Sequence, residues 1–225
     1  MQHRILVLGL IGTLAAAGCS QSPAIPQDDK QKLSYTIGHQ VGMKIKEDGI
    51  DVDPALVAQG LSDVIGGVEP KLTEDEMRNV MMAYQQQRFQ EFKDLADKNQ
   101  KTGDEFLAEN KKKDGVTTLA SGLQYKVITA GKGRKPKASD TVVAHYRGTL
   151  LDGKEFDSSI TRGEPATFPV ANVIPGWQEA LKLMPEGSKW EVYIPSNLAY
   201  GPRGAGANIG PNQTLVFEIA LIKVQ

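Results

Sequence analysis

The chain has 225 residues, which is enough for one large domain or two domains of moderate size. Its 26 Lys and Arg residues are balanced by 27 Asp and Glu residues, so bulk charge does not favour nucleic acid, and we expect no nucleic-acid partner. Hydrophobic residues make up 40% of the chain, which allows a folded core and leaves room for a long solvated element.

The first eighteen residues are typical of a secretory signal peptide. His3 and Arg4 form a short polar, basic start, and an uncharged, largely apolar run follows from Ile5 to Ala17. This run is shorter than the roughly 20 apolar residues that a membrane-spanning helix needs. Residues 1–18 are therefore predicted to be a signal peptide.

Cys19 is the only cysteine and directly follows the small residues Ala16–Gly18. This arrangement resembles the lipobox of bacterial lipoproteins, with Ala16 where Leu is usual. It implies that the mature chain begins at Cys19, carries a lipid there and is anchored to the membrane. Ordinary cleavage is the alternative and would leave a free thiol, which is unusual in a secreted chain. We expect residues 19–27 to be a flexible tether, and Ser20 indicates an outer-membrane lipoprotein of the bacterial envelope, facing the periplasm or the cell surface.

The segment from Asp28 to Asp48 has helical periodicity. Its apolar residues recur every four positions, at Leu33, Ile37, Val41 and Ile45. Gly38 and Gly42 lie on an adjacent stripe of small residues. Because glycine costs about 1 kcal/mol in a helix relative to alanine, two glycines on one face indicate that another helix packs closely there.

Two further helices are expected before residue 114. Asp53-Pro54 is typical of an N-cap followed by proline in the first turn, and Gly66-Gly67 ends that helix. Thr73–Glu76 is a capping box at the start of a long pattern. If this helix continues through Gly103, it has about 40 residues and is about 60 Å long. A mostly polar helix of that length cannot be a core element, and we interpret it as a strut between two modules.

Two short helices and part of a long one offer few surfaces for an independent core. A compact three-helix monomer is one alternative. We favour pairing of two chains, so residues 28–113 are predicted to be a helical dimerisation domain, with a linker helix at about 73–113 and a homodimer interface within residues 28–95. The methionines of this half would fill the dimer core: Met43, Met77, Met81 and Met82.

After residue 113 the sequence changes to strands and turns. Strands are predicted at 123–129, 141–150, 156–158, 190–194 and 215–222, with one amphipathic helix at 177–184. Asp152-Gly153 indicates a hairpin, and residues 201–213 form a loop rich in glycine and proline. The predicted layout of residues 114–225 is α+β, an antiparallel sheet with one helix packed on it.

No familiar catalytic constellation appears in this half. It has one histidine, His145, and no cysteine, metal-ligand cluster, serine-nucleophile signature or phosphate-binding loop. We therefore expect no metal and no cofactor, and we assign His145 a structural hydrogen bond. The aromatic residues are unusually many. Trp177 opens a helix and Tyr200 opens a glycine-rich loop, and at such edges an apolar pocket meets water.

Six segments of this half resemble the FKBP family of peptidyl-prolyl cis–trans isomerases, in the family's order and close to its spacing. They are His145–Gly148, Gly153–Ser159, Val173–Trp177, Ile194-Pro195, Ala199–Gly201 and Leu215–Glu218. The whole chain is similar to the Mip-like (macrophage infectivity potentiator-like) bacterial lipoproteins of that family. The resemblance implies an isomerase domain at 114–225, in which the antiparallel sheet wraps around the short helix.

The resemblance also implies the site. The catalytic residues it implies are Tyr146, Phe156, Asp157, Trp177, Tyr200 and Phe217, and the substrate-binding residues are Val173, Ile174, Ile209, Arg162 and Phe168. In the family, the residue at Trp177 forms the pocket floor, and the Ile174 N–H and the Tyr200 hydroxyl bind ligand carbonyls. Asp157 would pair with Arg162 and hold the Tyr146 hydroxyl.

Two positions depart from the best-known members of the family. Ala166 replaces an aromatic residue, which puts one pocket wall in question. Ala205 replaces a histidine often found there, which bears on sequence preference and on affinity for macrolide inhibitors of the rapamycin type. We disfavour a general-acid role for Asp157, because a carboxylate beside Arg162 should stay ionised.

The implied activity is isomerisation of X–Pro bonds in folding envelope proteins, together with chaperone activity. Rotation about such a bond is opposed by a barrier of about 18–20 kcal/mol, because amide resonance must be broken. An apolar pocket that solvates the twisted transition state better than the planar ground state lowers this barrier without a nucleophile. The alternatives are a non-catalytic chaperone or binding module that only holds proline-containing segments, and a purely structural lipoprotein.

Overall fold

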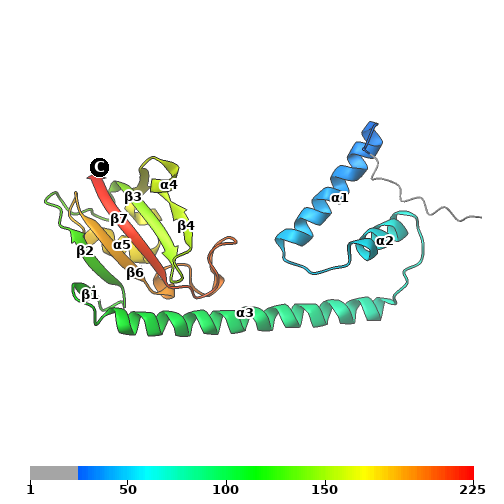
Figure 1. Cartoon of the computed structure of the whole chain (residues 1–225), viewed down its shortest axis with the longest axis horizontal. Helices are drawn as coiled ribbons and strands as arrows, with labels where there is room; N and C mark the ends of the chain where they lie inside the picture. The colour runs from blue at the N-terminus through cyan, green and yellow to red at the C-terminus, as the bar shows by residue number, and fades with distance from the viewer. Residues whose placement is uncertain (1–24) are drawn as a thin grey trace, which may run out of the picture. The chain divides into compact units, whose positions relative to one another are not determined.

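The computed structural model describes residues 25–225, so the predicted signal peptide, the lipidation site Cys19 and most of the tether lie outside the described residues. The described chain divides into two compact units (Figure 1). The first ends at Thr73, and the second comprises Glu74–Gln225. The long helix therefore belongs to the same unit as the sheet, whereas the sequence analysis grouped it with the first two helices.

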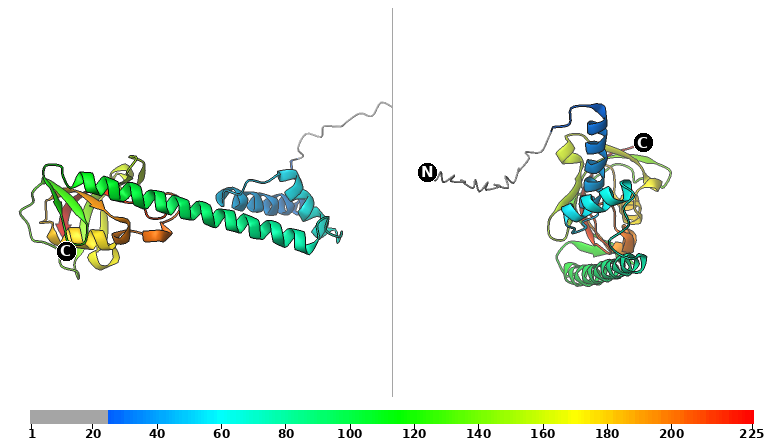
Figure 2. Two further views of the ribbon diagram at one scale, coloured as in Figure 1. Left: turned by 90° about the horizontal axis from the view of Figure 1, so that it is seen from below. Right: turned by 90° about the vertical axis from the view of Figure 1, so that its right-hand side faces the viewer.

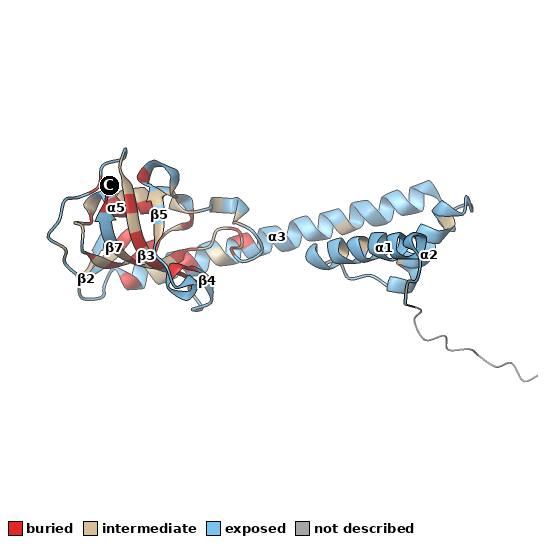
Figure 3. Cartoon of the chain, turned by 90° about the horizontal axis from the view of Figure 1, so that it is seen from above, coloured by how far each residue is buried: buried red, intermediate tan, exposed pale blue. Residues whose placement is uncertain are grey.

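The first unit contains α1 (Asp29–Glu47) and α2 (Pro54–Ile65). The Asp53 carboxylate accepts a hydrogen bond of 2.8 Å from the Ala55 N–H, which is the N-cap that the sequence predicted. No side chain of α1 or α2 is buried within the chain, and both helices are almost entirely exposed in Figure 3. Their apolar faces are therefore uncovered in the single chain.

The second unit begins with α3 (Glu74–Asn110), a continuous helix of 37 residues that starts at the predicted capping box and does continue through Gly103. At 1.5 Å per residue it is about 55 Å long. Figure 2 shows its C-terminal half beside the sheet domain. Three residues of that half are buried: Ala96, Gly103 and Asn110.

The sheet contains seven antiparallel strands in the order β1-β2-β6-β7-β3-β4, with β5 also paired to β3. Their bounds are β1 Val116–Thr118, β2 Gln124–Thr129, β3 Thr141–Leu150, β4 Glu155–Ser158, β5 Ala166–Pro169, β6 Lys189–Ile194 and β7 Leu215–Val224. The central strands β3 and β7 place Tyr146 opposite Ile219 and Gly148 opposite Phe217. The α+β prediction is confirmed.

Helix α5 (Pro175–Leu183) supplies Trp177, Ala180 and Leu181 to the core, and the sheet curves around it (Figure 1). Gly176 allows the helix to lie close to the sheet, because a Cβ atom there would be 2.5 Å from Ile194. The remaining elements are short: α4 Ser159–Arg162, η1 Val170–Asn172, η2 Ser196–Leu198 and η3 Gly201–Arg203. Among residues 25–225, no helix combines the length and apolarity needed to cross a membrane.

Candidate functional site

A cavity of about 280 Å³ opens between α5, the central strands and the loops at one end of the sheet. Its walls combine aromatic rings with a few polar groups. The lining residues are Tyr146, Phe156, Asp157, Phe168, Asn172, Val173, Ile174, Trp177, Tyr200 and Phe217. A largely apolar hollow with few polar groups is typical of a binding site for a small apolar group.

Trp177 lies at the centre of the aromatic lining. Pro175 starts α5, so Trp177 is in its first turn and its ring is held against the sheet. Three rings pack edge-to-face on it: Tyr146 at 5.4 Å between centroids, Phe168 at 5.6 Å and Phe217 at 5.3 Å. The indole Nε1 is buried and has no hydrogen-bond partner within residues 25–225. The Trp177 ring is thus held rigidly at the base of the cavity, and its Nε1–H is an unpaired donor within the described residues.

The polar side of the cavity is a three-residue network. The Tyr146 hydroxyl donates to Asp157 Oδ2 over 2.5 Å, and Arg162 forms an ion pair with the other carboxylate oxygen, Oδ1. Arg162 also donates to the Tyr146 hydroxyl at 2.8 Å, and its guanidinium lies 5.5 Å from the centre of that ring. Because every member bonds to the other two, the Tyr146 ring is held in one orientation.

The network sets the ionisation of its members. Burial alone would raise the pKa of the Asp157 carboxyl, but hydrogen bonds from Tyr146 and Arg162 outweigh it and hold that pKa below its ordinary value. Burial, and next the hydrogen bond to Asp157, raise the pKa of the Tyr146 hydroxyl. At neutral pH the carboxylate is therefore ionised and the phenol keeps its proton.

Two further groups at the rim can bind a ligand carbonyl. Tyr200 leads into the loop before β7, its side chain is partly exposed, and burial raises the pKa of its hydroxyl, which therefore remains a donor at neutral pH. The Ile174 N–H lies just before α5 and donates to no acceptor within the described part of the chain. Both donors are adjacent to the aromatic floor.

The structure brings most of the predicted residues together. All six residues predicted as catalytic line the cavity, as do Val173, Ile174 and Phe168. Arg162 does not line it but bonds to two residues that do. Ile209 is buried within the loop, where it forms a bridge with Ala205, and does not line the cavity.

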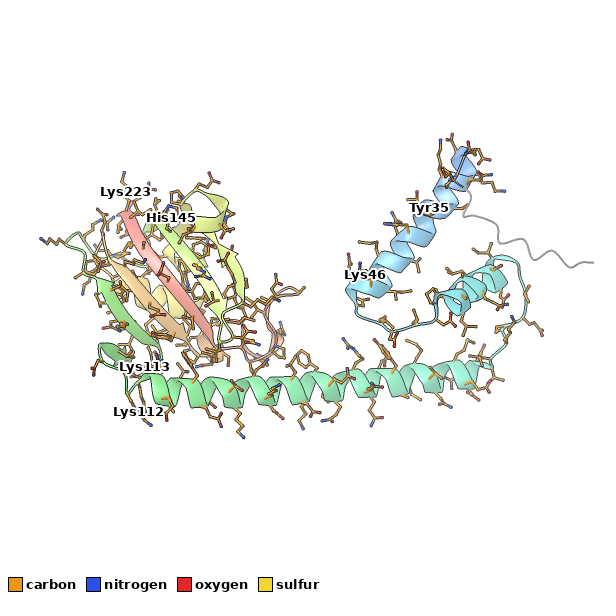
Figure 4. The ribbon with its side chains drawn as sticks, viewed as in Figure 1. Tyr35, Lys46, Lys112, Lys113, His145 and Lys223 are labelled. Atoms are coloured by element: carbon orange, nitrogen blue, oxygen red, sulfur yellow. The ribbon has the colours of Figure 1, made fainter. Side chains whose placement is uncertain are left out.

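Sequence reasoning missed Asn172 and Ser159. Asn172 ends η1 and lines the cavity next to Val173, and its only signal was this adjacency. Ser159 is fully buried, and its Oγ accepts from the Tyr146 N–H at 2.8 Å. His145, labelled in Figure 4, places its Nδ1 at 3.1 Å from the same oxygen. His145 therefore supports the backbone of Tyr146 through Ser159, which agrees with the structural hydrogen bond predicted for it.

Among residues 25–225, no group of three or more His, Cys, Asp or Glu side chains could hold a metal ion. The groups at the cavity offer apolar solvation, hydrogen bonding from the Ile174 N–H and the Tyr200 hydroxyl, and the field of the Asp157–Arg162 ion pair.

Comparison with known families gives two adjoining matches. Residues 30–127 match the domain amino terminal to FKBP-type peptidyl-prolyl isomerase. Residues 132–222 match the FKBP-type peptidyl-prolyl cis–trans isomerase domain, which includes every residue that lines the cavity.

Relatives and solved structures agree with these matches. The chain is 46% identical to the outer membrane protein MIP of Legionella longbeachae, over all of this chain and 99% of the relative. It is 43% identical to the peptidyl-prolyl cis–trans isomerase Mip of Coxiella burnetii, over 98% of both chains. The crystal structure of FkpA from Escherichia coli covers 88% of this chain and 98% of its own, with a TM-score of 0.64 and 38% identity.

Proposed function

The chain belongs to the FKBP-type peptidyl-prolyl cis–trans isomerase family, and on that premise we propose that the cavity around Trp177 holds the proline of a polypeptide while the preceding peptide bond rotates. The activity is acceleration of X–Pro isomerisation, with proline-containing polypeptides as substrates. The observation that carries the site assignment is the packing of Tyr146, Phe168 and Phe217 edge-to-face around the Trp177 ring.

The mechanism is differential solvation of the twisted bond. In the transition state the carbonyl is less polar and resonance is lost, so an apolar aromatic cavity stabilises that state relative to the planar bond. The Ile174 N–H and the Tyr200 hydroxyl would bind flanking carbonyls and hold the chain while the bond rotates. A 10⁴-fold acceleration requires about 5.4 kcal/mol of such stabilisation.

Asp157 acts as an orienting group in this proposal. Its carboxylate is ionised at neutral pH, because its pKa lies below the ordinary value, so it has no proton to give to the substrate. Its charge holds Arg162 and the Tyr146 hydroxyl at the cavity wall. No proton transfer is needed for bond rotation.

A non-catalytic binding module is the competing function for the same cavity. Two measurements on the chain beginning at Ser20 separate the two: affinity for an unfolded, proline-containing polypeptide, and the rate of X–Pro isomerisation in a short peptide. An isomerase accelerates the short peptide, and Trp177→Ala reduces that rate. Binding of the polypeptide by a folded chain without any acceleration would favour the binding module.

We also propose a homodimer through residues 28–95. In the single chain, large apolar side chains on the helices of this segment are exposed, among them Leu33 at 61% and Ile37 at 53%. A Cβ atom at Gly38 or Gly42 would meet nothing within 4 Å, so the small-residue stripe of α1 is also open. Residues 28–113 would then be the dimerisation domain and 114–225 the isomerase domain. Two cavities in one dimer would bind one client by avidity, which supports the proposed chaperone activity.

The location we propose is the bacterial envelope, as an outer-membrane lipoprotein anchored through Cys19. A relative that matches the full length of the chain is named an outer membrane protein, and the sequence at Ala16–Cys19 supports lipidation. Its clients would be folding envelope proteins, and macrolides of the rapamycin type would occupy the same cavity as inhibitors.

A further inference from the structure

The C-terminal half of α3 presents a face of small, amide and aromatic residues to the sheet domain. Its members follow one another at intervals of three or four residues, so they lie on one side of the helix. They are Ala96, Asn99, Gly103, Phe106 and Asn110. Apart from Leu107, which is half-buried, the rest of this half is exposed and mostly polar, which is why its sequence resembles a solvated strut.

Asn99 forms a hydrogen bond to the loop that follows Tyr200. Its side-chain Nδ2 donates a hydrogen bond of 2.8 Å to the Pro211 carbonyl, across 112 positions of sequence. Pro211 is itself buried. One residue later, Asn212 Nδ2 donates to the Ala96 carbonyl over 3.4 Å, a weaker contact in the opposite direction. The C-terminal end of the loop therefore accepts one hydrogen bond from α3 and donates another to it.

Gly103 brings the helix close enough for these bonds. A Cβ atom at this position would lie 2.3 Å from Thr214 Oγ1, so a larger residue would push the helix away from the start of β7. Further along, the Phe106 ring packs on Tyr193 at 5.9 Å between centroids. The contact between α3 and the domain is thus continuous from the loop to the sheet.

Asn212 connects these contacts with α3 to the backbone beside Tyr200. The Asn212 N–H donates 2.9 Å to the Gly201 carbonyl and closes the loop on the residue next to Tyr200. Among residues 25–225, Asn212 is the only residue other than glycine with a positive φ, 52°, a conformation that asparagine tolerates better than most residues. On the other side of Tyr200, the Ser196 hydroxyl donates to Gln100 of α3 at 3.1 Å.

From these contacts we infer that Asn99 is a positioning residue for the isomerase site: α3 fixes the loop that carries Tyr200 and so sets where the Tyr200 hydroxyl lies above the cavity. The helix is then part of the isomerase site's support as well as a connection between modules. This inference rests on the proposed role of Tyr200 in binding substrate.

The test is a double-mutant cycle in the chain beginning at Ser20, with kcat/KM for an X–Pro peptide as the readout. Asn99→Ala should lower kcat/KM about three- to tenfold, because the loop loses the shorter of its two hydrogen bonds to α3. Within a Tyr200→Ala background the same change should cost less than twofold, because the group that Asn99 positions is gone. Equal losses in both backgrounds, or no loss in either, would overturn the inference.

Asn110→Ala is the matched control. Asn110 is an amide on the same face of α3, but it bonds to Gln124 at 3.0 Å, away from the loop. Its removal should lower the melting temperature and leave kcat/KM within twofold, whereas a loss equal to that of Asn99→Ala would contradict a loop-specific role. Wild type and Trp177→Ala separate the two proposals. An inactive, folded wild type overturns the proposed function, and an active wild type that Trp177→Ala impairs but Asn99→Ala does not overturns only the inference.

Discussion

The Tyr146 hydroxyl and the Asp157 carboxylate are joined by a hydrogen bond of 2.5 Å at the wall of an otherwise aromatic cavity. The bond links a residue of the central strand β3 to one of the edge strand β4, and Arg162 completes it by bonding to both. The pair therefore holds one pocket wall in place without a covalent or metal link.

The ionised state of Asp157 predicts the pH dependence of activity. Because its folded-state pKa lies below the ordinary 3.8, its contribution to stability is present above that value and is lost as pH falls through the lower folded pKa. We expect kcat/KM to be constant from about pH 5 to 8, where Asp157 stays charged. Measuring the profile for wild type and Asp157→Asn tests this. Activity that rises as the carboxyl gains a proton would instead support a general acid.

Gly148→Ala should displace two aromatic rings that line the cavity. A Cβ atom there would lie 2.6 Å from the Phe156 ring and 2.8 Å from the Phe217 ring, and both rings line the site. Overpacking of this kind costs about 1–3 kcal/mol. We expect a lower free energy of unfolding and reduced kcat/KM, measured by denaturant titration and peptide assay. Gly153→Ala is a control for stability alone, because a Cβ atom there meets nothing and only its positive φ is strained.

Asn212→Gly and Asn212→Ala should behave differently. Glycine keeps the positive φ without strain and loses only the weak bond to Ala96, whereas alanine must adopt a left-handed conformation that costs about 1–2 kcal/mol. We expect the glycine variant to unfold near the wild-type melting temperature and the alanine variant well below it. Equal melting temperatures would show that the backbone at this position is not constrained.

Replacing Leu33 and Ile37 together by glutamate should dissociate the proposed dimer. Both side chains are exposed in the single chain, so the change costs the isolated helix little, but it would bury two charges in an interface. Sedimentation velocity should show a dimer for wild type and a monomer for the variant. Lys32→Glu, on the opposite side of the same helix, should remain dimeric. Isomerisation of a short peptide should be unchanged, because the cavity lies within residues 74–225.

Elements with a strong sequence period could be predicted well, and short or long-range features could not. The strand predicted at 141–150 matches β3, in which every second residue is buried and only Val143 interrupts the alternation of residue types. Strand β5 (Ala166–Pro169) and helix α4 (Ser159–Arg162) are four residues each, too short to carry a period. The docking of Asn99 was invisible because its partner, Pro211, lies 112 residues away and an amide in a polar helix resembles a solvated residue.

The central claim is that the ring of Trp177 is the floor on which an X–Pro bond rotates. The most direct test is the rate of cis–trans exchange of a short X–Pro peptide at equilibrium, followed by NMR with catalytic amounts of the chain beginning at Ser20. The account predicts clear acceleration by wild type, a loss of at least about tenfold for Trp177→Ala, and a smaller loss for Tyr200→Phe, which removes one hydrogen bond worth about 0.5–1.5 kcal/mol. A folded Trp177→Ala variant with wild-type exchange rates would contradict it.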